Sequence, residues 1–218
     1  EEVTAVTEEY LEGIYRLQQR SGVARTSEMV EMLQVVPGTV TNTVERLERE
    51  GLVTHEPYKG VKLTEEGRKI ALDVIRRHRL SERLLTDILH MGWDEAHKAA
   101  CRLEHGITGN IVKNLEKTLG HPTTCPHGNP IPTKCGGILE EESEPLTNLE
   151  LDESGTIVKI TEEEPDVLRY LAKLGLTLGA SVRVEEKIPF SGPIVLNVKG
   201  VSRALGRNIA SIIRVKKC

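Results

Sequence analysis

The sequence predicts an α+β protein made of several small domains, and three observations support this fold class. Apolar residues recur at helical spacing through most of the first 119 residues, except at 52–63, where two β-prone runs flank a Pro/Gly turn. After an acidic stretch at 140–145, the pattern changes to strand-like alternation punctuated by glycines. Hydrophobic residues make up 38% of the chain with one Phe and one Trp, so aliphatic side chains must build the cores, which suits small domains.

Residues 1–64 are predicted to form a winged helix-turn-helix domain. Three short helices are expected to begin near Thr7, Thr26 and Pro37, and Gly51 ends the third in a C-cap position. The hairpin that follows would supply the wing.

Residues 65–139 are predicted to form a helical domain, and residues 146–218 a small β-barrel behind a linker at 140–145. The apolar faces of the helices at 65–119 exceed what one winged helix can cover. We therefore expect the helical domain to form a homodimer, and the potential metal ligands that it carries predict that it also binds metal.

The third predicted helix has the features of a DNA recognition helix, which needs short polar side chains on its exposed N-terminal turns. The residues expected to bind DNA there are Pro37, Thr39, Thr41, Asn42 and Thr43. The candidates for phosphate contacts are Arg25, Arg46, Lys59 and Lys62. The alternatives are that the threonines only solvate a helix surface and that the basic side chains form surface salt bridges.

The charge balance argues weakly against a nucleic-acid partner. The net charge is −4, and residues 1–64 carry seven Arg or Lys against eleven acidic residues. DNA binding must therefore depend on local patches and on something that offsets the acidic charge, which metal ions held by glutamates would do.

Potential metal ligands recur at helical spacing in three predicted helices. The set at positions i, i+4, i+7 and i+8, expected along one helix face, is His97, Cys101, Glu104 and His105. Two further pairs with helical spacing are His78 with Glu82 and Glu9 with Glu12. Mixed sulfur, nitrogen and oxygen donors suit Fe(II), Co(II), Ni(II) or Zn(II) better than Mn(II). The alternative is a buried free cysteine beside surface His–Glu pairs.

The loop after residue 120 holds further candidates for a zinc site, namely Cys125, His127 and Cys135, with His121. Their spacing is not that of a standard zinc finger, and an ordinary loop is the alternative. The four cysteines are too sparse for a disulfide framework, so a reducing cytoplasm is expected. No long apolar run occurs, and we expect no membrane partner.

Two motifs resemble those of the metal-dependent repressors of the diphtheria-toxin-repressor type, in particular the iron-dependent regulators. They are His78-Arg-Leu-Ser-Glu82 and His97-x3-Cys101-Arg-x-Glu104-His105, and the loop from His127 to Pro132 is similar to the segment that follows in that family. The C-terminal segment resembles the SH3-like domain of FeoA proteins, at Leu168-x-Tyr-Leu-x-x-Leu-Gly-Leu176 and at Ala204-Leu-Gly206.

This resemblance implies two metal sites. The residues that match the regulatory site are Cys101, Glu104 and His105, with Glu9 and also Glu12 from the first helix. Those that match the ancillary site are His78, Glu82 and His97, with Glu164 as the nearest match to a ligand from the SH3-like domain.

The chain departs from the iron-type pattern in its first helix. Glu9 stands where the iron regulators place Met, whereas the manganese-sensing branch uses carboxylates that match Glu9 and Glu12. Cys101 follows the iron type, and Val167 stands where the SH3-like domain would supply a second polar ligand. We expect Fe(II) as the activating metal, with Mn(II) as the alternative and with Co(II), Ni(II) or Zn(II) able to substitute.

The sequence therefore predicts a dimeric, metal-activated transcriptional repressor that controls metal homeostasis and binds a palindromic DNA operator. A metal-dependent hydrolase or oxygenase is a remote alternative, because no nucleophile motif or substrate pocket is recognisable. A metal buffer is a further alternative, and the winged-helix pattern argues against it.

Overall fold

The computed structural model describes residues 3–56 and 59–217. The chain divides into two compact units, and the division falls within one helix, between His78 and Arg79. The first unit is Glu1–His78 with two short returns of the chain, Glu104–Thr108 and Pro132–Gly137. The second unit holds the remaining helices and the C-terminal sheet. The sequence boundaries at 64, 139 and 146 stay predictions.

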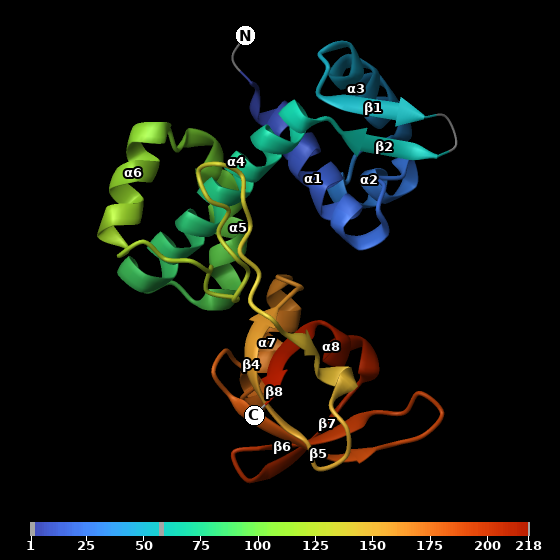
Figure 1. Ribbon diagram of the computed structural model, residues 1–218, viewed down its shortest axis with the longest axis vertical. Coiled ribbons are helices and arrows are strands. Elements are labelled where there is room, and N and C mark those ends of the chain that lie inside the picture. The colour runs from blue at the N-terminus through green and yellow to red at the C-terminus, as the bar shows by residue number, and fades with distance from the viewer. Residues whose placement is uncertain (1–2, 57–58, 218) are drawn as a thin grey trace. The chain divides into compact units, whose positions relative to one another are not determined.

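The first unit contains the winged helix-turn-helix, and the structure confirms this expectation (Figure 1). Its elements are α1 (Ala5–Ser21), α2 (Thr26–Leu33), α3 (Pro37–Arg49), β1 (Val53–Glu56) and β2 (Gly60–Leu63). The two strands pair antiparallel, with Val53 opposite Leu63. The predicted turn around Pro57 falls on residues 57–58, outside the described part of the chain. The core of this domain is aliphatic, with Leu11, Ile14, Met29, Val40 and Leu47 buried.

Local interactions explain where these helices begin and end. The Thr4 hydroxyl accepts a hydrogen bond from the Thr7 backbone N–H and so caps α1, which ends at Gly22 in the left-handed region at φ 77°. Pro37 occupies the first turn of α3, where its missing N–H costs nothing and its fixed φ suits the helix.

The helices that follow are α4 (Glu65–Arg83), α5 (Trp93–Leu103) and α6 (Gly109–Thr118). A π-helical turn, Leu84–Ile88, extends α4. A tighter 3-10 turn, Glu104–Gly106, follows α5. The expectation that one helix face carries ligands from residue 97 to residue 105 is therefore wrong. The α-helix ends at Leu103, and a 3-10 turn of three residues changes the direction of the side chains beyond it.

The second unit contains the predicted SH3-like domain, which the structure confirms as a six-stranded antiparallel sheet. The strands, in sheet order, are β3 (Glu144–Pro145), β8 (Ile213–Lys217), β4 (Ser154–Ile160), β5 (Ser181–Lys187), β6 (Ile194–Val198) and β7 (Val201–Leu205). The register shifts once in the β4–β8 pair and once in the β5–β6 pair. Such bulges increase the twist of a sheet and help it to curve around a core.

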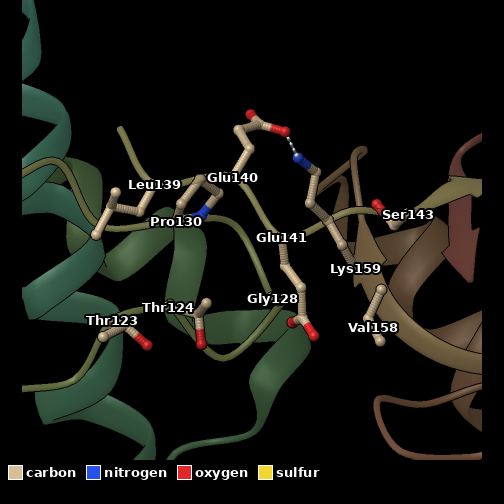
Figure 2. A pocket seen from close by; sticks show the side chains of 10 residues that line it. All are labelled: Thr123, Thr124, Gly128, Pro130, Leu139, Glu140, Glu141, Ser143, Val158 and Lys159. Atoms are coloured by element: carbon tan, nitrogen blue, oxygen red, sulfur yellow. Dashed lines mark hydrogen bonds and ion pairs between the residues drawn. The ribbon is translucent and has the colours of Figure 1, made fainter. Parts of the chain in front are cut away.

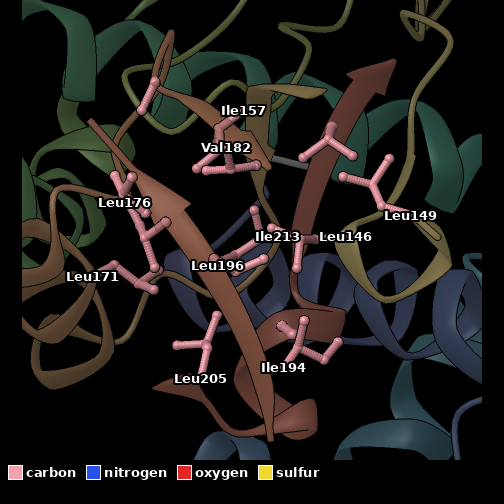
Figure 3. Close-up of a cluster of buried hydrophobic side chains, with 14 of the residues drawn as sticks. Leu146, Leu149, Ile157, Leu171, Leu176, Val182, Ile194, Leu196, Leu205 and Ile213 are labelled. Atoms are coloured by element: carbon pink, nitrogen blue, oxygen red, sulfur yellow. The ribbon is translucent and has the colours of Figure 1, made fainter. Parts of the chain in front are cut away.

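One core of aliphatic side chains is enclosed by this sheet (Figure 3). It also includes side chains of α7 (Pro165–Leu174), α8 (Arg207–Ser211) and the 3-10 turn Leu146–Asn148. Trp93, at the start of α5, packs against the same core, which attaches α5 to the sheet within the second unit. In the described part of the chain no helix has both the length and the apolar character that crossing a membrane requires.

Candidate metal centres

A buried group of metal donors lies in the second unit. Atoms of Glu82, Cys125, His127 and Glu163 all lie within 4.8 Å of one another, and the four residues are buried. We call this group the loop centre, because Cys125 and His127 stand on the loop between α6 and β3. Glu82 comes from α4, and Glu163 stands two residues before α7 (Pro165–Leu174). The four side chains thus reach the centre from three segments of the chain.

The ring of His127 is oriented by the backbone of α5. Its Nε2 lies 2.8 Å from the carbonyl oxygen of Trp93, to which it donates a hydrogen bond. This assignment leaves Nδ1 facing the carboxylates, at 3.5 Å from Glu82 and 3.7 Å from Glu163. An imidazole held by a backbone carbonyl on one nitrogen presents the other nitrogen as a metal ligand.

The loop that carries Cys125 and His127, which we call the ligand loop, packs closely against β4. The backbone N–H of Ile160 donates to the carbonyl of His127 at 2.9 Å, and the side-chain amide of Asn129 donates to Ile160 and to Glu163. Gly128 has a φ of 83°, and a Cβ built on it would lie 2.1 Å from the carbonyl oxygen of Val158. Only glycine therefore allows this approach of the loop to the strand.

A cavity of about 290 Å³ opens beside this contact (Figure 2). It is lined by residues of the ligand loop, the linker and β4, and the ion pair between Lys159 and Glu140 at its rim spans 3.2 Å. None of the four donors of the loop centre is among its lining residues. The cavity is therefore separate from the metal donors.

His97 adjoins the loop centre from α5. Its Nδ1 lies 3.1 Å from a carboxylate oxygen of Glu82 and 3.1 Å from one of Glu163, and its Nε2 lies 3.9 Å from the sulfur of Cys101. Burial opposes protonation of His97, but hydrogen bonds with Cys101, Glu163 and Glu82 outweigh it and raise the pKa of the imidazole to about 11. His97 is therefore an imidazolium at neutral pH.

The electrostatics of the loop centre fit a divalent cation. Burial raises the pKa of the Cys125 thiol well above its usual range, and the charges of Glu82 and Glu163 add to this effect. Burial lowers the pKa of His127, yet Glu82 and Glu163 outweigh burial and leave that pKa raised. The negative charges of Glu82 and Glu163 thus favour protons on the neighbouring imidazole and thiol, because buried charges need compensation. A metal ion could take the place of these protons.

Metal binding at the loop centre should release protons. The pKa of His97 is raised to about 11, and the pKa values of His127 and Cys125 are raised as well, so all three favour the protonated form and each must lose a proton before it can act as a ligand. Apparent metal affinity is therefore expected to rise from pH 6 to pH 8. Calorimetric titration in buffers of different ionisation enthalpy measures the protons released. Cys125→Ser should release about one proton fewer, since a serine hydroxyl stays protonated. Equal release by both proteins would exclude Cys125 as a ligand.

A second group of donors lies in the first unit, and we call it the α1 centre. The Nε2 of His105 lies 3.5 Å from Glu104 Oε1 and 3.8 Å from Glu9 Oε1. The other Glu104 oxygen lies 2.5 Å from Nδ1 of His78. Burial raises the pKa of Glu104, and the negative charge of Glu12 adds to this, while His78 opposes it. A cation held by these residues would stabilise the ionised carboxylate.

Several predicted ligands are placed differently from the expectation. Cys101 is exposed and belongs to the second unit, whereas Glu104 and His105 belong to the first, so its role in the regulatory site stays a prediction. The same holds for the assignment of His78 to the ancillary site. Glu164 is exposed, and the preceding Glu163 is the acid that reaches the donors. The reason is that Pro165 begins α7, so Glu164 serves as its N-cap residue.

The structure also places residues that the spacing argument missed or left uncertain. Cys125 and His127 contact Glu82 and Glu163, whereas Cys135 is exposed and belongs to the first unit, so a zinc site that includes Cys135 stays a prediction. Glu8 is buried and contacts His105, although its neighbour Glu9 carries the motif match. The sequence does carry short signals for these residues. A Cys-x-His pair marks Cys125 and His127, and Glu8 is an acidic residue on the inner face of α1.

The recognition helix α3 presents its polar residues to solvent. Thr39, Thr41 and Asn42 are exposed, and Thr43 is half-buried. Among the basic candidates, Arg25, Lys59 and Lys62 are exposed. Arg46 differs, because it donates to Thr7 Oγ1 at 3.2 Å and pairs with Glu50 at 2.9 Å. The bond to Thr7 attaches α3 to α1, and the pair with Glu50 lies at the end of α3, so a phosphate contact by Arg46 would compete with both.

Family models match the chain in three consecutive parts. Residues 2–61 match the iron dependent repressor N-terminal DNA binding domain, and residues 64–133 match the iron dependent repressor metal binding and dimerisation domain. Residues 144–217 match the FeoA domain.

Individual proteins are similar over nearly the whole chain. The iron-dependent repressor IdeR of Mycobacterium tuberculosis is 33% identical over 99% of both chains. The diphtheria toxin repressor of Corynebacterium diphtheriae is 32% identical over 97% of this chain and 96% of the relative. Among solved structures, a manganese-dependent transcriptional repressor in complex with manganese has a TM-score of 0.88 and 31% identity over 97% of this chain and 100% of that one. ScaR with bound Cd²⁺ has a TM-score of 0.85 and 31% identity, over 97% and 99% of the two chains.

Proposed function

This chain belongs to the iron-dependent repressor family, and from this premise we propose how its two metal centres make it a DNA-binding repressor. It is a metal-activated transcriptional repressor that acts on DNA as a homodimer, and not an enzyme. The finer proposal is that Fe(II) held by the loop centre and the α1 centre promotes binding to a palindromic operator of genes for metal homeostasis. Its site of action is then the cytoplasm, where DNA is accessible.

The observation that carries this proposal is the composition of the α1 centre. Glu9 belongs to α1, which is part of the winged helix-turn-helix, whereas Glu104 and His105 follow α5. Residues that hold one ion together restrict how α1 can lie relative to the 104–106 turn. Metal then favours DNA binding to the extent that it binds this arrangement more tightly than others.

The donors of the two centres differ in softness. The loop centre contains the Cys125 thiol, and a soft sulfur donor favours Fe(II), Co(II) or Zn(II) over Mn(II). The α1 centre offers oxygen and nitrogen atoms, which suit Mn(II) as well. We therefore propose Fe(II) as the physiological metal, with Mn(II) as the alternative and with Co(II), Ni(II) and Zn(II) as substitutes. A reducing compartment would keep Cys125 as a thiol.

DNA recognition is assigned to α3. Thr39, Thr41 and Asn42 extend from its exposed face, and an asparagine side chain can bond both the N6 and N7 atoms of an adenine in the major groove. Arg25, Lys59 and Lys62 are the proposed phosphate contacts. In a twofold-symmetric dimer, two such helices would meet half-sites about one helical turn apart.

The test is a titration of DNA affinity with metal. Duplexes with a randomised twofold-symmetric site are selected with Fe(II)-loaded protein, and binding is then measured without oxygen in Fe(II), Mn(II), Co(II) and Zn(II). We expect metal-stripped protein to bind at least about 10-fold more weakly, within the usual range of allosteric coupling. The Cys125→Ser substitution should weaken activation of DNA binding by Fe(II) more than activation by Mn(II). The Cys101→Ala substitution shows whether Cys101 contributes to metal-dependent DNA binding. Equal DNA binding by metal-stripped and metal-loaded protein would refute the switch.

A further inference from the structure

Glu8 is a buried carboxylate of α1 that stands beside the α1 centre. Its Oε2 lies 2.6 Å from Nδ1 of His105, and its Oε1 pairs with Arg77. Its side chain is 12% exposed, compared with 56% for the adjacent Glu9. Both oxygens of Glu8 are thus engaged with nitrogen donors inside the first unit.

The contact with Glu8 determines how the His105 ring is presented. The ring N–H at Nδ1 donates to the carboxylate, so Nε2 carries the lone pair and lies nearest to Glu104 and Glu9. A carboxylate on the second nitrogen fixes the tautomer and the ring orientation of a histidine ligand and raises its basicity. We propose that Glu8 is a positioning residue of the α1 centre, which orients His105 toward the metal without binding the metal itself.

Arg77 extends the same network to the other ligand. It pairs with Glu8, donates to the backbone carbonyl of Glu104 at 2.9 Å, and pairs with Asp73 at 3.1 Å. The guanidinium is buried, where its fixed fork geometry loses little on binding several acceptors. Glu8 and Arg77 together therefore hold the His105 ring and the Glu104 backbone in place.

The residue before Glu8 connects the network to the recognition helix. Thr7 is buried and accepts a hydrogen bond from Arg46 of α3 at 3.2 Å. Two consecutive residues of α1 thus contact the metal-facing histidine and the DNA-reading helix. A shift of α1 that carries Glu8 toward or away from His105 would move the anchor of α3 as well.

This inference rests on the proposed function of the α1 centre, and its test separates the two. The parent protein carries Glu163→Gln, which weakens the loop centre, so that Co(II) absorption reports the α1 centre. In this parent, Glu8→Gln keeps the size of the side chain and removes its charge. Asp73→Asn is the matched control, because Asp73 pairs with the same Arg77 but from an exposed position, with 62% of its side chain accessible.

We expect Glu8→Gln to lower Co(II) affinity about 10- to 100-fold, the usual effect of losing an outer partner of a metal ligand. The visible spectrum at saturation should keep the band positions of the parent, because the ligands are unchanged. Asp73→Asn should remain within about threefold of the parent, as expected for an exposed ion pair. The melting temperature of the metal-free variants shows that the fold persists.

Two results would overturn the role of Glu8 while leaving the α1 centre in place. Unchanged Co(II) affinity would show that it does not position His105, and shifted absorption bands at saturation would show that it is a ligand itself. If the Glu163→Gln parent binds no Co(II) while the wild type does, the α1 centre as proposed is wrong, and the role of Glu8 is refuted with it.

Discussion

Glu104→Gln is expected to abolish metal-dependent DNA binding while the metal-free protein remains folded. Glu104 is 2% exposed and lies between His78 and His105, so its carboxylate is the central anionic donor of the α1 centre. Glutamine removes the charge and keeps the shape. Because burial raises the pKa of Glu104, the folded protein already disfavours the charged form, and the neutral side chain should cost little stability.

The loss of metal affinity should be at least the 10- to 100-fold that removal of an outer partner typically causes, since a direct ligand is lost. Calorimetry with Co(II) measures affinity, and a gel shift with the selected duplex measures DNA binding. Glu142→Gln, an exposed acid of the linker, is the matched control and should behave as wild type. Retained metal activation in Glu104→Gln would exclude the α1 centre as the regulatory site.

Gly128→Ala is expected to destabilise the attachment of the ligand loop to β4. The φ of 83° costs a residue with a Cβ about 1–2 kcal/mol, and the Cβ would lie 2.1 Å from the Val158 carbonyl. Overpacking of this kind typically adds about 1–3 kcal/mol. The loop would have to move away from β4, which separates Cys125 and His127 from Glu163 and lowers metal affinity at the loop centre.

Gly179→Ala is the matched control, because Gly179 has a φ of 78° and nothing within 4 Å of its built Cβ. It should show only the cost of the backbone conformation. Chemical denaturation compares the free energies of unfolding, and amide hydrogen exchange at Ile160 reports whether its bond to His127 persists. Equal destabilisation by both substitutions would show that the close contact with Val158 does not matter.

The secondary structure was predictable where the signals are local. The winged helix-turn-helix depends on apolar spacing and on Pro37, which act within a few residues, although α1 begins at Ala5 behind the cap Thr4 rather than near Thr7 as predicted. A small β-barrel follows from period-two alternation and glycine turns, whereas its SH3-like character was implied by the resemblance to FeoA proteins. The helix predicted through residue 105 failed for a reason that apolar spacing does not report. A 3-10 turn replaces the α-helix after Leu103, and the spacing of the ligands alone could not show it.

What the sequence by itself determined is therefore the set of elements, the family and the kinds of donor atoms that could bind metal. Helical spacing relates residues only within one element, and it placed Glu82 and Glu9 among the candidate ligands. Tertiary structure alone decided which donors meet, because Cys125, His127 and Glu163 reach Glu82 from segments far apart in the chain. It also decided that Glu8 contacts His105 and that Glu163 replaces Glu164, since in both pairs the packing of the backbone selects which of two adjacent acids faces inward.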